Sequence, residues 1–310
     1  MGNYSIRVLQ KIIVLFIVMV AGYICKKSKI LNISSTKTLS NLLTYITNPC
    51  LIFCSLQMEY NTETLKRAGY IFLLSVLVHT IMAIISHFLF SKCKSRTSRS
   101  VYSYALTYMN CGFMGYPIMM AIFGNEQGLF YGVIYSTVFN LFTWTHGIII
   151  MNPQNGKIPW KKLIYNPALI ASVSSIILFL TRFMLPGTLK DGLTMLGDMT
   201  FPLSMIIIGS LLADMKLTKI FSQPSVYAFS FLKLLIVPLV MLVIAKLLHL
   251  PDYISITAVT MCAVPSASST AILAEVYDND SALAARLVGV TTLFCLITMP
   301  FMLWLSQIVL

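Results

Sequence analysis

Two short stretches decide the fold of this chain: Asn110-Cys111-Gly112-Phe113-Met114-Gly115-Tyr116-Pro117 and Cys262-Ala263-Val264-Pro265-Ser266-Ala267-Ser268-Ser269. Each interrupts an apolar run with residues that unwind a helix. Lipid cannot hydrogen-bond free backbone groups, so irregular backbone at membrane depth survives only inside the protein or beside a watery cavity. Paired interruptions at corresponding places in two halves indicate a binding site near the membrane midplane.

The composition places the chain in a lipid bilayer. Of its 310 residues, 57% are hydrophobic and 10% are charged, and the mean hydropathy is +0.83. A soluble domain would carry about 25% charged residues. The net charge of +12 comes from basic residues in short loops between apolar runs, which indicates topology rather than a nucleic-acid partner. The sequence therefore predicts an all-α polytopic membrane protein.

Ten apolar segments are long enough to cross a membrane, at about 20 residues each. We place them at 7–25, 39–58, 68–90, 101–123, 127–150, 163–183, 192–213, 225–248, 252–275 and 282–308. The first is expected to be a retained span, because lysines follow it directly and no cleavage site of small residues is present. The longest polar stretch in the middle separates a first five-helix repeat (1–150) from a second (163–310), with a short linker at 151–162.

Basic residues in the loops predict the orientation. Fourteen lie in the odd-numbered loops and seven on the other side with both termini. We therefore expect a multi-pass protein of the cell membrane with both termini outside and a cytoplasmic central loop. The fourteen are Lys26, Lys27, Lys29, Lys37, Lys92, Lys94, Arg96, Arg99, Lys157, Lys161, Lys162, Lys216, Lys219 and Arg286.

The two halves show similar spacing. An odd number of spans makes the second half enter the membrane from the opposite side, so similar halves form an inverted repeat. Pro202 follows Pro49 by 153 positions, and Pro265 follows Pro117 by 148. Lys233 follows His79 by 154. These offsets predict a 5+5 inverted repeat in which the fourth and ninth spans are symmetry mates.

The first interruption carries backbone and side-chain features of a ligand site. Gly112 and Gly115 tolerate unusual backbone, and Pro117 removes a donor and clashes with the carbonyl of Phe113. Half-helix ends expose N–H groups that suit an anion, and Asn110 both donates and accepts. The alternative is a kinked, buried helix whose small residues allow close packing.

The second interruption offers Pro265 followed by Ser266, Ser268 and Ser269. Their hydroxyls can line a polar pocket or re-satisfy backbone groups freed by the proline. Ser268 and Ser269 are the stronger candidates for ligand contact, because they follow the proline as a donor pair.

Three ionisable residues within the spans are candidates for charge balance or coupling. Lys233 lies deep in the eighth span, as a counter-charge for an anion or as a partner to carbonyls or an acid. Asp198 is a candidate cation or proton site or a structural acid, and His79 a proton relay or a packed histidine. The seven cysteines are scattered and predict no metal site. No enzyme, nucleotide or cofactor motif is present, so we expect neither an enzyme nor a cofactor.

Several motifs together resemble the auxin efflux carrier family. They are Asn48-Pro49-Cys50-Leu51, the 110–117 stretch, Asn166-Pro167-Ala168-Leu169, Phe201-Pro202-Leu203 with Ile208-Gly209-Ser210-Leu211-Leu212, and the region around Pro265. The resemblance covers essentially the whole chain. The family includes plant PIN-formed auxin carriers and prokaryotic malate and malonate permeases. Bacterial relatives often carry an Asn after the ninth-span proline, where this chain has serines and a threonine.

The resemblance implies a scaffold domain and a transport domain. The broken spans would cross at Pro117 and Pro265, with Asn48, Pro49 and Pro202 supporting further breaks and Asn110 contacting the substrate. It also implies elevator-type transport of small organic anions, and we expect the substrate to be a mono- or dicarboxylate and the protein to form a homodimer. The alternative hypothesis is a membrane receptor or regulator that binds a ligand without net transport.

Overall fold

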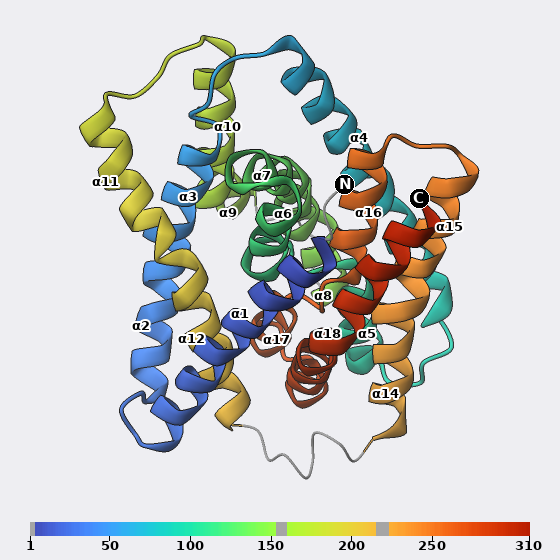
Figure 1. The fold of residues 1–310 in the computed structure, drawn as a ribbon. Helices are drawn as coiled ribbons and strands as arrows, with labels where there is room; N and C mark the ends of the chain where they lie inside the picture. Colours follow the sequence, from blue (N-terminus) through green and yellow to red (C-terminus); the bar gives the residue numbers. More distant parts are fainter. Residues whose placement is uncertain (1–3, 153–159, 215–222) are drawn as a thin grey trace.

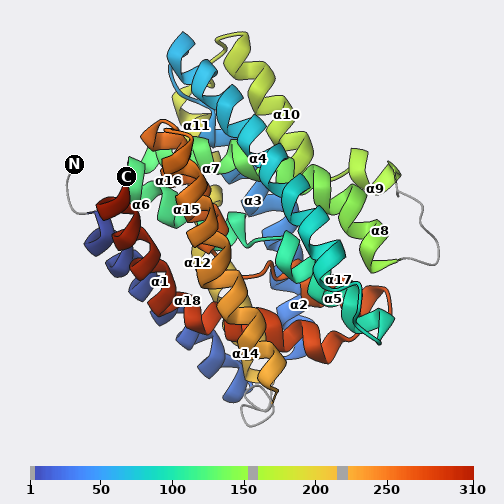
Figure 2. The same ribbon diagram turned by 90° about the vertical axis from the view of Figure 1, so that its right-hand side faces the viewer.

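The computed structural model describes residues 4–152, 160–214 and 223–310. All regular secondary structure in these ranges is helical (Figures 1 and 2), and the only extended pairing within them is one isolated bridge between Met109 and Ser266. The all-α prediction is confirmed.

The helices follow the predicted segments closely. The first half comprises α1 (Tyr4–Lys27), α2 (Ile33–Leu42), η1 (Leu43–Thr47), α3 (Asn48–Ser55), α4 (Thr62–Leu89), α5 (Arg96–Thr107), η2 (Cys111–Gly115), α6 (Tyr116–Phe123), α7 (Asn125–Phe142), η3 (Thr143–Gly147) and α8 (Ile148–Met151). The second half comprises α9 (Trp160–Ile164), α10 (Pro167–Leu180), α11 (Gly187–Asp198), α12 (Thr200–Asp214), α14 (Pro224–Phe231), η4 (Leu232–Ile236), α15 (Val237–Leu247), α16 (Asp252–Ala263), α17 (Ser269–Val276) and α18 (Ser281–Val309).

Six helices of the described residues are long and apolar enough to cross a membrane. They are Ile6–Lys27, Thr62–Leu89, Asn125–Met151, Gly187–Ala213, Pro224–Leu247 and Ser281–Val309. Two shorter apolar helices, Cys111–Phe123 and Pro167–Leu180, accompany them. A polytopic membrane protein is therefore supported, whereas the count of ten spans stays a prediction. The predicted linker at 151–162 begins at the last residue of α8 and ends within α9. Its residues 153–159, which include Lys157, lie outside the described residues, as do the loop residues Lys216 and Lys219.

Proline explains three of the widened turns. The π-helical turns η1, η2 and η4 end two residues before Pro49, Pro117 and Pro238. In each, the N–H after the turn bonds five residues back, as Tyr116 does to the carbonyl of Cys111. Because a proline ring clashes with the carbonyl four residues back, a wider turn makes room for it. Pro49 therefore follows a widened turn rather than a break. Pro202 is the third residue of α12, just after the single residue, Met199, that separates α11 from α12.

The helices form two groups. In Figure 1, α2, α3, α11 and α12 lie on the left, α14, α15 and α16 on the right, and α6, α7 and α17 between them. α1 packs along α12, and α3 packs against α10 and α11. In the other group, α7 packs against α4 and α6, and α18 against α14, α16 and α17. We call α1–α3 with α9–α12 the first group, and α4–α8 with α14–α18 the second.

The contact between α1 and α12 depends on two glycines. A Cβ on Gly209 would lie 1.9 Å from the carbonyl oxygen of Met19, and one on Gly22 would lie 2.3 Å from that of Ile206. Small residues let membrane helices approach backbone to backbone. Gly209 belongs to a motif that contributes to the family resemblance. A glycine is needed at this position because α1 approaches α12 so closely there.

Gly209→Ala should therefore push α12 away from α1 and lower the thermal unfolding midpoint in detergent. Gly69→Ala is the matched control, because a Cβ there meets nothing within 4 Å and alanine favours a helix over glycine by about 1 kcal/mol. Equal midpoints for the two variants would contradict the close approach.

Candidate functional site

The two interruptions meet and pair through their backbones. Met109 and Ser266 form an antiparallel bridge. The N–H of Asn110 donates to the carbonyl of Pro265 at 2.8 Å, and the N–H of Ala267 donates to the carbonyl of Tyr108 at 3.0 Å. We call the segments 108–110 and 265–267 the crossing. The predicted meeting of the two broken helices is confirmed for their backbones.

The position of the crossing corrects one expectation. Pro265 lies in the crossing, but Pro117 lies beyond it, in the first turn of α6. The two bridged residues are Met109 and Ser266, 157 positions apart (266 minus 109), so the expectation that the spans cross at Pro117 was wrong. A proline marks a missing donor, and the wide turn η2 already accommodates Pro117 without unwinding the helix there.

The chain leaves both helices in extended conformation. α16 ends at Ala263, and Val264 has φ −68° and ψ 153°, the region that a following proline favours. α5 ends at Thr107, and Tyr108 has φ −105° and ψ 121°. Gly115 lets the crossing pack closely, because a Cβ there would lie 3.0 Å from the sulfur of Met261 on α16.

Two side chains from the second half take over the carbonyls at the end of α5. The last carbonyls of a helix have no partner within it. The hydroxyl of Ser266 donates to the carbonyl of Ala105 at 2.9 Å, and the Nζ of Lys233 donates to that of Leu106 at 2.9 Å. Both side chains are fully buried. Ser266 and Lys233 were each predicted either to face a ligand or to bond to groups of the protein, and the structure shows both bonding to backbone carbonyls.

Asn110 is the one asparagine of the crossing. Its backbone carbonyl accepts from the N–H groups of Met114 and Gly115, at 3.3 and 3.1 Å. Its side chain is 5% exposed, and it makes no hydrogen bond with any residue that the structure describes. The amide is therefore not committed to a protein partner, and its small exposed area leaves it able to hydrogen-bond a ligand.

The half-helices that follow the crossing begin with free donors. In the described part of the chain, the N–H groups of Gly112 and Phe113 have no acceptor, and the same holds for Ser268 and Ser269. These four residues are also partly exposed, unlike the crossing itself. The N-termini of η2 and α17, each with positive partial charge, therefore lie beside the crossing. The hydroxyl of Ser269 bonds to that of Tyr104 at 3.0 Å, and that of Ser268 has no partner within the described ranges.

Of the remaining candidates, His79 alone reaches the crossing, where its ring centroid lies 6.3 Å from that of Tyr108. His79 is fully buried; its Nδ1 bonds to the carbonyl of Ser75 at 2.8 Å, and its ring packs against Tyr135 and Phe142. Asp198 is exposed at the end of α11 in the first group. Asn48 and Pro49 are half-buried and Pro202 is exposed, all three in the first group. The structure does not bring Asp198, Asn48, Pro49 or Pro202 to the crossing.

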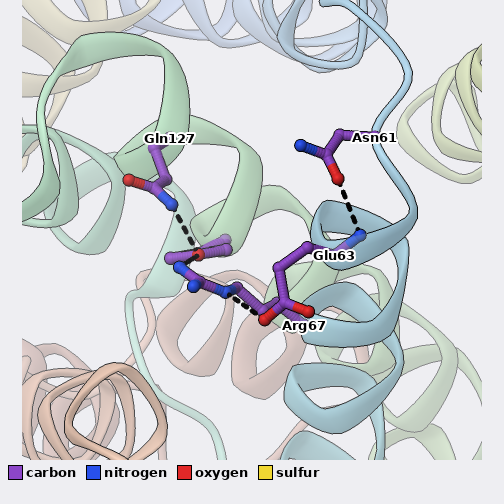
Figure 3. Close-up of polar contacts among 5 residues, drawn as sticks. Asn61, Glu63, Arg67 and Gln127 are labelled. Atoms are coloured by element: carbon purple, nitrogen blue, oxygen red, sulfur yellow. Dashed lines mark hydrogen bonds and ion pairs between the residues drawn. The ribbon is translucent and has the colours of Figure 1, made fainter.

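Sequence reasoning missed a polar cluster at the starts of α4 and α7. Arg67 lies 3.1 Å from Glu63 and 3.4 Å from the hydroxyl of Tyr131, which also accepts from Gln127 at 2.7 Å (Figure 3). The guanidinium also lies over the ring of Tyr253 on α16. This cluster joins three helices of the second group. Only the i, i+4 spacing of Glu63 and Arg67 could have indicated part of it.

A cavity of about 600 Å³ lies between the α3–α4 loop and the end of α10. Its walls include Tyr60, Phe179 and Arg182, and none of its lining residues belongs to the crossing. This cavity is therefore separate from the crossing.

Ser266→Ala should lower the thermal unfolding midpoint, because it leaves the carbonyl of Ala105 buried without its donor, at a cost of about 1–3 kcal/mol. Ser268→Ala should leave the midpoint unchanged. Differential scanning fluorimetry on both purified variants tests this contrast, which a destabilised Ser268→Ala or an unaffected Ser266→Ala would contradict.

Comparison with known proteins identifies the family. A family model described as "Membrane transport protein" matches residues 7–303. An uncharacterised transporter of Methanocaldococcus jannaschii is 25% identical over 95% of this chain and 97% of its own length. One of Methanothermobacter thermautotrophicus is 26% identical over 95% and 96%, and the uncharacterised transporter YfdV of Escherichia coli K12 is 23% identical over the same shares. The resemblance in the motifs is thus confirmed, and the chain belongs to the membrane transport protein family that includes the auxin efflux carriers.

Proposed function

We propose that this membrane transporter carries small organic anions, mono- or dicarboxylates, through a site beside the crossing. The observation that carries the proposal is the backbone pairing of two broken helices, which leaves two helix N-termini with free N–H groups next to an unpaired asparagine amide. Such ends favour anions. The residues that form or support the proposed substrate site are Asn110, Gly112, Gly115, Pro117, Pro265, Ser266, Ser268 and Ser269.

These residues divide by role. Asn110 and the donors at Gly112, Phe113, Ser268 and Ser269 contact the substrate. Pro265 and Ser266 hold the crossing, since the carbonyl of Pro265 already accepts from the N–H of Asn110 and the hydroxyl of Ser266 donates to the carbonyl of Ala105 on α5. Gly115 and Pro117 shape the packing and the widened turn. The charge of Lys233 adds positive potential, and among the described residues no carboxylate pairs with it.

The division of the helices into two groups supports elevator-type alternating access. We assign the first group to the scaffold and the second to the moving transport domain, because every residue of the crossing lies in the second. The two hydrogen bonds of the crossing are related by a two-fold about the bridge. The similar spacing of prolines in the two halves, such as Pro49 and Pro202 at 153 positions, supports a ten-span inverted repeat with halves 1–150 and 163–310. Both termini outside the cell membrane, a cytoplasmic linker and a homodimer complete the proposal.

Uptake into proteoliposomes tests the function. Radiolabelled malate, malonate and a set of monocarboxylates should enter vesicles containing the wild-type protein, with saturable kinetics for at least one acid. Saturable binding of an acid without flux would instead favour the receptor or regulator, and a folded protein with neither would contradict an organic-anion site.

Substitution of Asn110 tests the site. Asn110→Ala should reduce flux about tenfold, in line with losing a hydrogen bond to a charged group, and Asn110→Asp should reduce it further because its carboxylate repels an anion. Asn41→Ala, at an exposed position on α2, is the control. Wild-type kinetics for Asn110→Asp would remove Asn110 from the site.

A further inference from the structure

Lys233 is a lysine buried in the middle of a span without an acid beside it. It lies in the widened turn η4, between α14 and α15, and its side chain is fully buried. Within the described residues, its one hydrogen bond goes to the carbonyl of Leu106 at 2.9 Å, and the ion pair of the described residues is elsewhere, between Arg67 and Glu63. Burying an ammonium costs free energy unless other groups compensate its charge, so the surroundings of Lys233 must stabilise it.

The crossing leaves the carbonyl of Leu106 without its helical donor, and Lys233 donates to this carbonyl instead. In an unbroken helix, the carbonyl of Leu106 would accept from the N–H of Asn110, four residues on. That N–H is diverted to the carbonyl of Pro265 at 2.8 Å. The last carbonyls of α5 also carry the negative end of its dipole. The ammonium thus satisfies an acceptor that exists only because the helix is broken.

The charge of Lys233 lies close to both interruptions. Its ammonium lies at the end of α5, two residues before the crossing begins at Tyr108, and η4 packs against α16, which leads into the second interruption. Two helix C-termini meet at the crossing, and their negative ends oppose the entry of an anion. A cation at the end of α5 offsets one of them.

Transporters with broken helices hold coupling cations at half-helix C-termini and unwound carbonyls. We propose that the Lys233 ammonium occupies such a cation position, as a tethered replacement for a bound Na⁺, so that the anion site is complete without a coupling cation. This inference rests on the proposed function for its consequence for transport. Its structural part, a monovalent-cation position at the carbonyl of Leu106, stands independently.

Removal of the side chain should open the position to a free cation. Lys233→Ala deletes a volume that matches propylammonium. Propylammonium should raise the unfolding midpoint of Lys233→Ala in a saturable manner, because a ligand that binds only the folded state stabilises it. It should leave the wild type unchanged. Methylammonium, Na⁺ and tetramethylammonium serve as smaller and bulkier probes, and tetramethylammonium should have no effect because it cannot donate a hydrogen bond.

Two variants are matched controls. Lys233→Met removes the charge but fills the space, so propylammonium should not stabilise it. Lys246→Ala removes an exposed lysine of α15 that donates to the carbonyl of Val309 at 2.8 Å, and it should behave as the wild type. A folded Lys233→Ala that no cation stabilises would overturn the proposal, as would equal stabilisation of Lys233→Met.

Flux completes the test. Replacing Na⁺ by N-methylglucamine on both sides should leave wild-type uptake unchanged, and a requirement for Na⁺ would overturn the proposal even if Lys233→Ala fails to fold. Uptake by Lys233→Ala should fall about tenfold or more and recover with propylammonium. If the wild type transports no acid, the proposed function fails, whereas the stabilisation by propylammonium still decides the cation position.

Discussion

The structure depends on one constraint, the need to satisfy backbone groups where two helices are broken inside an apolar protein. The crossing meets it with the hydrogen bonds between Asn110 and Pro265 and between Tyr108 and Ala267. Ser266 and Lys233 donate to the two carbonyls that the crossing leaves without a partner at the end of α5. Once those groups are satisfied, the remaining free donors lie at the two helix N-termini. A structural requirement of the membrane thereby leaves positive potential beside a neutral amide.

The two interruptions are not chemically equal. At the first, the asparagine amide is free and the widened turn η2 separates it from Pro117. At the second, Ser266 holds α5 and Ser269 bonds to Tyr104, so that of its three serines Ser268 keeps an unused hydroxyl within the described residues. Lys233 reinforces this asymmetry, because its charge sits at the end of α5. A substrate would therefore be held mainly by Asn110 and by backbone donors.

Much of the fold could be predicted from apolar runs and loop composition, because lipid demands long apolar helices. The interruptions themselves were recognisable from Gly112, Gly115 and Pro265. The register of the crossing was not, since prolines report where a donor is missing and not where two backbones meet. Partners of Ser266, Lys233 and Arg67 were also beyond prediction, because each bonds to an element distant in sequence. For the close contact of α1 with α12, the sequence showed only the motif around Gly209 and did not indicate which helix packs there.

Cross-linking tests the crossing most directly. Met109 and Ser266 are the pair that does not exchange hydrogen bonds, for which Cα atoms lie about 4.5 Å apart, within the range of a disulfide. Met109→Cys with Ser266→Cys, in a background with Cys111 and Cys262 replaced by alanine, is combined with a protease site in the linker at 153–159. After oxidation and cleavage, the account predicts that the two halves stay covalently joined on a non-reducing gel and separate on reduction. Halves that separate without reductant, from a protein that remains folded, would contradict it.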